Sequence, residues 1–303
     1  MSATAFHRLQ QGVFPALWTP TDQNGRLLEP EFARFIDFGI RSGVSGFMVL
    51  GTTGEFPHLE VSERKRVVEA ARSRAGGLPL MVNISDIRPR VVAELGRFCK
   101  DLGVDAISLL PPYYFTLSQE DLLEFFLRSA EAAGLPAFLY NFPERVGYRI
   151  SLETAAAFAD RAPMLGIKQS GAEFAYHQEL VALGRQKHFV VFTGSDTALP
   201  EAMALGVVGT VSGLSNALAD LVVKVYQGVS QGRGRAEIPE AAWLTEIEGK
   251  LSAMEFPFNV GAALAARGFD LGASKMLASV ASLSRFERLK AEFQALYSKW
   301  NLL

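Results

Sequence analysis

The sequence predicts a (β/α)8 barrel at residues 1–235, followed by a helical extension at residues 236–303. Short β-type apolar runs alternate with helical patterns roughly eight times in about 230 residues, as in a closed parallel barrel. An open doubly wound sheet would instead carry a glycine-rich phosphate turn after its first strand, and residues 19–22 are not such a turn. The length of 303 residues suits one large α/β barrel or two smaller domains.

Each predicted strand is a short apolar run that is followed by a turn and then by a helical pattern. In chain order, the predicted strands are residues 13–18, 46–50, 78–84, 106–110, 137–141, 165–170, 189–192 and 207–211.

The predicted helices carry apolar residues at helical spacing, and some begin at a recognisable start signal. They cover residues 31–42, 88–102 and 151–160, and others begin near Ser62 and Ser118. Ser151 is the expected N-cap of its helix, with Glu153 in the first turn.

The tail from residue 238 to residue 303 is predicted to be helical throughout and to pack on the barrel or on a neighbouring subunit. Its apolar residues at helical spacing are the candidates for burial. These are Phe256, Phe258, Leu264, Phe269, Leu277, Leu283, Phe286, Leu289, Phe293 and Leu296.

Composition and charge exclude several classes of protein. The net charge of −2 without a basic run argues against a nucleic-acid partner. No apolar run approaches the ~20 residues of a membrane-spanning helix. Residues 1–11 lack the apolar block of a secretory signal, so a cytoplasmic location is expected. The single cysteine, Cys99, lies in a helical pattern and is interpreted as a packing residue.

The sequence also lacks the motifs of several hydrolytic mechanisms. The four histidines, at positions 7, 58, 177 and 188, are scattered without metal-ligand spacing, so neither a metal site nor a cofactor is predicted. The predicted strand ends carry no paired carboxylates for sugar hydrolysis. There is no Gly-x-Ser-x-Gly elbow of a serine hydrolase.

Lys168 stands where the apolar run of residues 165–167 ends. Burial of an ammonium is unfavourable, and a buried lysine generally gives up its proton more readily, which frees the amine as a nucleophile. The alternative is a lysine that extends from a strand end into solvent. The other lysines lie in polar or helical contexts: Lys65, Lys100, Lys187, Lys224, Lys250, Lys275, Lys290 and Lys299.

Barrel enzymes place their chemistry at the C-terminal ends of the strands. Lys168 and Tyr140 are expected there, and a lysine that faces a tyrosine suits Schiff-base chemistry on a ketone, with the phenol carrying protons. The remaining residues at these ends contribute hydroxyls and glycine-rich turns. They are Thr52, Thr53, Tyr113, Tyr114, Gly194, Ser195, Ser212 and Gly213.

The turn from Gly51 through Gly54 to Glu55 could hold an anion. Its glycines allow backbone N–H groups to approach a ligand, and the hydroxyls of Thr52 and Thr53 add donors for a carboxylate. The alternative interpretation is a tight strand-to-helix turn without a ligand.

These residues resemble those of the dihydrodipicolinate synthase/N-acetylneuraminate lyase family of pyruvate-dependent class I aldolases, which are TIM barrels. The resemblance spans residues 18–216 and rests on the segments 51–55, 140–143 and 166–168. It implies that Lys168 forms an imine with pyruvate or another 2-oxo acid and that Tyr140 shuttles the proton. It also implies that Thr53 and the backbone around it bind the substrate carboxylate.

The resemblance further implies an oligomer, usually a homotetramer built as a dimer of dimers. Thr52 would then link Tyr140 to Tyr114 of a neighbouring subunit in a hydroxyl relay, although an interface tyrosine would look the same. Arg145 favours the synthase branch, in which it would bind the carboxylate of the second substrate. The alternative for Arg145 is a surface salt bridge with Glu144 or another neighbour.

Other segments depart from the synthase pattern and leave the second substrate open. They are the turn at residues 83–87, Gln169-Ser170 after the lysine, and the segment at residues 256–259. Ile87 and Val91 stand where lysine-regulated synthases carry polar inhibitor ligands, so no feedback inhibition by lysine is expected. The resemblance thus implies condensation of pyruvate with aspartate semialdehyde or a similar aldehyde. The alternatives are a 2-keto-3-deoxy sugar acid aldolase or dehydratase, an N-acetylneuraminate lyase-like enzyme, and a non-catalytic 2-oxo acid sensor.

Overall fold

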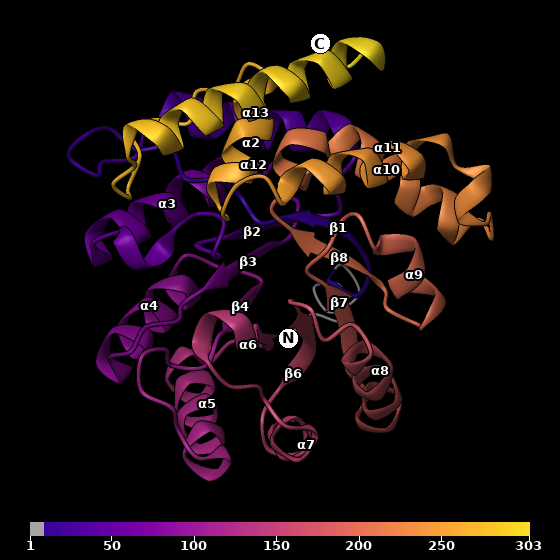
Figure 1. Ribbon diagram of the computed structural model, residues 1–303. Helices are drawn as coiled ribbons and strands as arrows, with labels where there is room; N and C mark the ends of the chain where they lie inside the picture. Colours follow the sequence, from indigo (N-terminus) through magenta and orange to yellow (C-terminus); the bar gives the residue numbers. More distant parts are fainter. Residues whose placement is uncertain (1–8) are drawn as a thin grey trace.

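The structure is a computed structural model, and it describes residues 9–303. Within these residues, eight parallel strands form one sheet in the order β1-β8-β7-β6-β5-β4-β3-β2. A parallel bridge between Ala16 and Met48 joins the two ends of this order, and Leu17 N–H donates to the Met48 carbonyl at 2.8 Å. Helices surround the sheet (Figure 1), which confirms the predicted (β/α)8 TIM barrel.

All of the predicted strands are present, and most of their ends lie within two residues of the expected positions. The largest difference is at β1, which ends at Pro15 rather than Trp18 because the chain changes its pairing partner there from β8 to β2. The strands are β1 Gly12–Pro15, β2 Phe47–Val49, β3 Leu80–Asn83, β4 Ala106–Leu109, β5 Ala137–Asn141, β6 Met164–Gln169, β7 Val190–Thr193 and β8 Gly209–Ser212.

The helix starts follow the sequence signals in part. Ser151 caps α7, because its Oγ accepts from Thr154 N–H at 3.1 Å, and Glu153 lies in the first turn as predicted. The helix α3 begins just before Ser62, with Glu60 at the cap position. The helices are α2 Glu29–Ser42, α3 Val61–Arg74, α4 Pro89–Asp101, α5 Gln119–Ala133, α6 Pro143–Val146, α7 Leu152–Arg161, α8 Tyr176–Lys187, α9 Leu199–Ala204, α10 Ser215–Ser230, α11 Pro239–Leu251, α12 Phe258–Ala266 and α13 Val280–Lys299, with short 3-10 turns η1 Phe56–His58 and η2 Arg235–Glu237.

An aromatic cluster fills part of the barrel. The rings of Phe14 and Phe138 pack edge-on against Phe192, with centroid distances of 5.5 and 6.0 Å. Glycines make room for these rings, since a Cβ on Gly46 would lie 2.5 Å from the Phe14 ring and a Cβ on Gly166 would lie 2.6 Å from the Phe138 ring. The interior next to the C-terminal strand ends is therefore packed and apolar.

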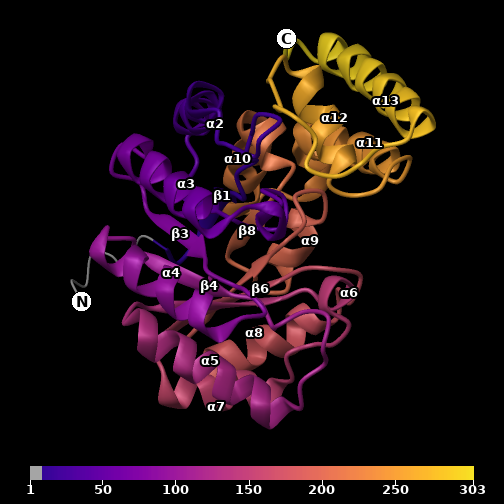
Figure 2. The same cartoon turned by 90° about the vertical axis from the view of Figure 1, so that its left-hand side faces the viewer.

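The C-terminal helices α11, α12 and α13 form a layer outside the barrel, against α10 (Figures 1 and 2). The prediction of a tail that is helical throughout is wrong, because residues 267–279 contain no helix. Gly268 and Gly272 in this segment have φ angles of 79° and 71°, which interrupt a right-handed helix. The division of the chain near residue 235 stays a prediction.

Two of the tail residues expected to be buried are exposed. Leu277 is fully exposed and Leu283 is 53 % exposed. The helical spacing that selected Leu277 does not apply to a non-helical segment, and Leu283, near the start of α13, borders a cavity between the barrel and the extension that leaves part of its side chain uncovered. The remaining candidates are buried (Leu264, Leu289, Phe293 and Leu296) or partly buried against the core (Phe256, Phe258, Phe269 and Phe286).

The structure also bears on the predictions from composition. Cys99 is buried as expected, and burial raises the pKa of its thiol to about 12. Between residues 9 and 303, no helix is both long and apolar enough to cross a membrane. His7 and most of the start at which no secretory signal is expected lie outside the described residues.

Candidate active site

Lys168 and Tyr140 meet at the C-terminal end of the barrel. They are register partners on the adjacent strands β6 and β5, so their side chains leave the sheet on the same face. Lys168 Nζ lies 4.2 Å from the centroid of the Tyr140 ring, and the two residues are 5 % and 1 % exposed. The amine is thus held against a phenol in a largely dry environment, which suits addition to a carbonyl.

Tyr140 is connected to the turn after β2. Its hydroxyl lies 3.0 Å from Thr52 Oγ1, and either oxygen can be the donor. Among residues 9–303, Lys168 Nζ has no hydrogen-bonding or ion-pair partner, so the amine is not engaged in a competing contact. Together these contacts provide a nucleophile and a nearby group able to transfer protons.

The turn that carries Thr53 packs against the end of β8. A Cβ on Gly213 would lie 2.5 Å from Thr53 Oγ1, so only glycine fits beside this hydroxyl. Gly54 N–H donates to the Gly51 carbonyl at 3.1 Å, and a Cβ on Gly54 would lie 2.9 Å from the Leu17 carbonyl. The turn is therefore compact and brings backbone groups and a hydroxyl close together.

Ser212, the last residue of β8, is 2 % exposed, and its hydroxyl has no hydrogen-bonding partner among the described residues. Buried hydroxyls are normally paired, so an unpaired one at a strand end is available to a ligand. Gly213, the next residue, packs against Thr53, and substrate binding by Ser212 and Gly213 stays a prediction.

Asp196, in the loop after β7, was missed by the sequence analysis. It is 3 % exposed, and its carboxylate accepts from Ser215 Oγ at 2.6 Å and from Ser215 N–H at 3.0 Å. Burial raises the pKa of Asp196 to about 6, while the Ser215 and Thr210 contacts and the charge of Lys168 act to lower it. The sequence feature that could have revealed Asp196 is an acidic residue shortly after a predicted strand end. In the structure, its buried carboxylate interacts electrostatically with Lys168.

Arg145 lies on α6, a short helix that the sequence analysis did not predict although Pro143 at its start is typical of one. The guanidinium lies over two rings, 5.7 Å from the centroid of Phe142 and 5.4 Å from that of Phe256. Within the described part of the chain it forms no ion pair, and the Glu144 carboxylate instead accepts from Ala172 N–H at 2.6 Å. The salt bridge to Glu144 is therefore not formed, and the guanidinium donors of Arg145 have no acceptor among residues 9–303.

Tyr114 is not near Tyr140 or Thr52 within the chain. It is 86 % exposed in the loop after β4, with a φ of 82°, and its ring packs edge-on against the exposed Phe115. Tyr113 turns inward instead, and its ring centroid lies 6.1 Å from that of Phe56.

Within the described residues, Lys168 is not the only lysine with a buried side chain. The side chain of Lys275 is only 5 % exposed and pairs with Glu55, the last residue of the turn around Thr53, at 2.9 Å. The sequence showed no signal for this contact, because Lys275 lies 220 positions from its partner.

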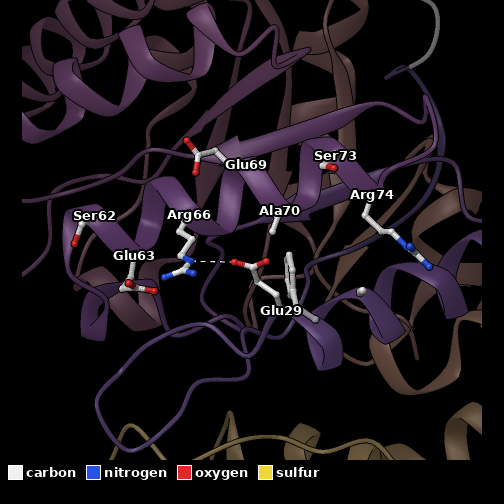
Figure 3. A pocket seen from close by; sticks show the side chains of 10 residues that line it. Glu29, Ser62, Glu63, Arg66, Glu69, Ala70, Ser73 and Arg74 are labelled. Atoms are coloured by element: carbon white, nitrogen blue, oxygen red, sulfur yellow. Dashed lines mark hydrogen bonds and ion pairs between the residues drawn. The ribbon is translucent and has the colours of Figure 1, made fainter.

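A hollow of about 750 Å³ lies on the outer helices between α2 and α3 (Figure 3). Its lining is rich in charged residues, and Arg66 donates to Glu29 at 2.9 Å across it (Figure 3). It contains none of the predicted site residues and is separate from the candidate active site.

Comparisons with known proteins agree with this geometry. A model of the dihydrodipicolinate synthetase family matches residues 9–293. An uncharacterised DapA-like lyase of Halobacterium salinarum is 31% identical over 263 residues, or 86% of each chain. The 4-hydroxy-tetrahydrodipicolinate synthase of Salinibacter ruber is 36% identical over 216 residues, or 71% of each chain. The structure is also similar to the crystal structure of YagE, a prophage protein of the dihydrodipicolinic acid synthase family from E. coli K12, in complex with pyruvate. The TM-score is 0.86 and the sequences are 27% identical, and the match covers 95% of this chain and 99% of YagE.

Proposed function

The chain belongs to the dihydrodipicolinate synthetase family, whose members are lyases, and on that premise we propose that it is a Schiff-base-forming lyase acting on pyruvate or a related 2-oxo acid. The observation that carries the proposal is the position of the Lys168 amine, 4.2 Å from the centroid of the Tyr140 ring at the C-terminal end of the barrel. The pyruvate complex of YagE supports the choice of 2-oxo acid.

The reaction begins when the Lys168 amine adds to the ketone carbon of the 2-oxo acid, and loss of water leaves a protonated imine. The imine withdraws electrons from the adjacent carbon, which loses a proton to give an enamine. The enamine carbon then attacks the aldehyde of the second substrate, and water finally releases the product and restores the amine. Tyr140, paired with Thr52, carries the protons of these steps, and the turn around Thr53 binds the substrate carboxylate with Ser212 and Gly213 beside it.

The proposed second substrate is an aldehyde that carries a carboxylate, with aspartate semialdehyde as the default. Two observations support it: relatives of the chain are named 4-hydroxy-tetrahydrodipicolinate synthase, and the guanidinium donors of Arg145 have no acceptor in the part of the chain that the structure describes. That guanidinium lies over the rings of Phe142 and Phe256, and its planar fork suits bidentate binding of a carboxylate.

Arg145→Ala is expected to raise the KM for the aldehyde by about 10- to 100-fold, since a charge-assisted hydrogen bond contributes about 1.5–3 kcal/mol. The KM for pyruvate should change little. Steady-state kinetics with each substrate varied in turn would measure both values. Arg149→Ala is the matched control, because Arg149 is also an exposed arginine over a ring, 4.9 Å from the centroid of Tyr176. An unchanged KM for the aldehyde in Arg145→Ala would remove the case for the synthase branch.

A second candidate activity is cleavage or dehydration of a 2-keto-3-deoxy sugar acid, including N-acetylneuraminate lyase-like chemistry. It is favoured by hydroxyls at the ends of β6 and β7: Ser195 Oγ lies 3.1 Å from Thr197 Oγ1, and a Cβ on Gly194 would meet Ser170 Oγ at 1.9 Å. Such hydroxyls would bind a polyhydroxylated substrate, and the imine at Lys168 would serve both reactions.

The proposal includes a homotetramer, a dimer of dimers, in which Tyr114 reaches the site of a neighbouring subunit. The exposure of Tyr114 and Phe115, at 86 % and 71 %, supports a contact surface at the loop after β4. Ile87, 46 % exposed, adds to the apolar side chains outside the barrel.

The test of the proposed function uses the purified full chain. Borohydride added with pyruvate should raise the intact mass by one reduced adduct, located at Lys168 by peptide mapping. The protein is then supplied with pyruvate and aspartate semialdehyde, and separately with 2-keto-3-deoxy sugar acids. Turnover of a sugar acid without turnover of the semialdehyde would replace the first candidate by the second. Trapping at Lys168 without turnover of the semialdehyde or of a sugar acid would support a non-catalytic 2-oxo acid sensor. An unchanged intact mass after borohydride and pyruvate would overturn the proposed imine chemistry.

A further inference from the structure

A buried ion pair joins the C-terminal extension to the turn that carries Thr53. Lys275 Nζ lies 2.9 Å from Glu55 Oε2, and the two side chains are 5 % and 7 % exposed. The same ammonium donates to the Thr19 carbonyl at 2.6 Å and lies 5.6 Å from the centroid of the Trp18 ring. One cation of the extension therefore contacts both the turn after β2 and the segment after β1.

The partner of Lys275 ends the turn in a left-handed backbone conformation. Glu55 has a φ of 55°, a left-handed conformation that a residue other than glycine keeps only when its surroundings hold it. Its N–H closes the turn by donating to the Thr52 carbonyl at 3.1 Å, next to the contact between Gly54 N–H and the Gly51 carbonyl. The side chain of Glu55 is thus the anchor of the backbone that presents Thr53.

The extension approaches this anchor along a defined path. Trp18 Nε1–H donates to the Leu271 carbonyl at 3.1 Å, and Ala273 N–H donates to the Thr21 carbonyl at 2.6 Å. A Cβ on Gly272 would lie 2.4 Å from the Thr21 carbonyl oxygen, so the two backbones are in close contact. These contacts bring Lys275 to Glu55 with little freedom.

An open space lies beside the pair. A cavity of about 220 Å³ lies between the barrel and the extension, and Glu55, Trp18 and Phe258 are among the residues that line it. Without its partner the carboxylate would be a buried uncompensated charge with room to turn into this cavity. The turn would then lose the contact that holds its last residue.

From these contacts we infer that Lys275 is a positioning residue for binding of the 2-oxo acid: it holds Glu55, and through Glu55 it holds the turn that receives the substrate carboxylate. The inference rests on the proposed function, because it takes that turn to be the carboxylate site. The C-terminal extension, which contributes no residue to the imine chemistry, thereby determines how well the barrel binds its first substrate.

The test uses three variants in the full chain. Lys275→Met removes the positive charge, and Lys275→Arg keeps it. The double variant Glu55→Gln with Lys275→Met removes both charges of the pair. It serves if Lys275→Met alone does not fold, because it leaves no unpaired buried carboxylate. Lys250→Met is the matched control, since Lys250 is another lysine of the extension, paired with Glu292 at 2.6 Å and away from the barrel turn. For each variant we would measure the pyruvate concentration that gives half-maximal borohydride trapping at Lys168, and hydrogen exchange of the peptide covering residues 51–58 without ligand.

Lys275→Met and the double variant are expected to need about tenfold more pyruvate, with the same maximal trapping, and to exchange faster in residues 51–58. Lys275→Arg and Lys250→Met should match the unmodified protein in both measurements. A lowered melting temperature with unchanged half-saturation and unchanged exchange would overturn the inference, because it would show a purely structural pair. Absence of trapping in the unmodified protein would instead defeat the proposed function, and exchange alone would then decide whether Lys275 holds the turn.

Discussion

Replacement of Lys168 by alanine is expected to abolish turnover, with a loss of about 10⁴-fold or more, while the protein remains folded. The substitution removes the nucleophile itself, and the other deeply buried lysine, Lys275, cannot replace it because Glu55 holds its ammonium at 2.9 Å. The barrel should tolerate the change, because Lys168 Nζ has no hydrogen-bonding partner between residues 9 and 303 that would be left unpaired.

The measurement combines turnover with borohydride trapping in the presence of pyruvate, read as intact mass. Lys187→Ala is the control, since Lys187 is a partly exposed lysine whose amine contacts Asp160 at 2.6 Å, and it should keep both the adduct and the activity. A Lys168→Ala protein that still forms the adduct would show that another amine is the nucleophile.

Tyr140→Phe is expected to lower kcat by about 10²–10⁴-fold, the range for loss of a general acid/base group. Phenylalanine keeps the ring beside the Lys168 amine and removes only the hydroxyl that lies 3.0 Å from Thr52 Oγ1. The KM for pyruvate and the thermal stability should therefore change much less than kcat. Steady-state kinetics and a melting curve measure the two effects separately.

The matched control is Tyr148→Phe, which also removes one tyrosine hydroxyl hydrogen bond, from Tyr148 to the Pro112 carbonyl at 2.7 Å. Its effect on kcat should be small, because this hydroxyl contacts neither Lys168 nor Thr52. If Tyr140→Phe and Tyr148→Phe had the same kcat, the Tyr140 phenol would not carry the protons of the reaction.

Part of the candidate site could be predicted because it depends on strand ends. Lys168 and Tyr140 each close a short apolar run, and parallel strands bring such ends to one edge of the sheet, where the register pairs the two residues. The packing of Gly213 against Thr53 follows from the same rule, since it joins the ends of β2 and β8. Residues beyond the strand ends, such as Arg145 on α6 and Tyr114 in a loop, could be named but not placed, because their positions depend on how the connecting segments fold.

By itself the sequence determined the barrel, the order of its strands and the lysine at the end of β6, because these follow from local apolar periodicity and from the handedness of parallel connections. Only the tertiary structure decided which charges are buried together, such as Lys275 with Glu55, and which apolar residues stay outside, such as Leu277. The spacing of apolar residues predicts which face of its own helix or strand a residue occupies. Burial of a charge depends on contacts with residues far away in the chain, which no local pattern encodes.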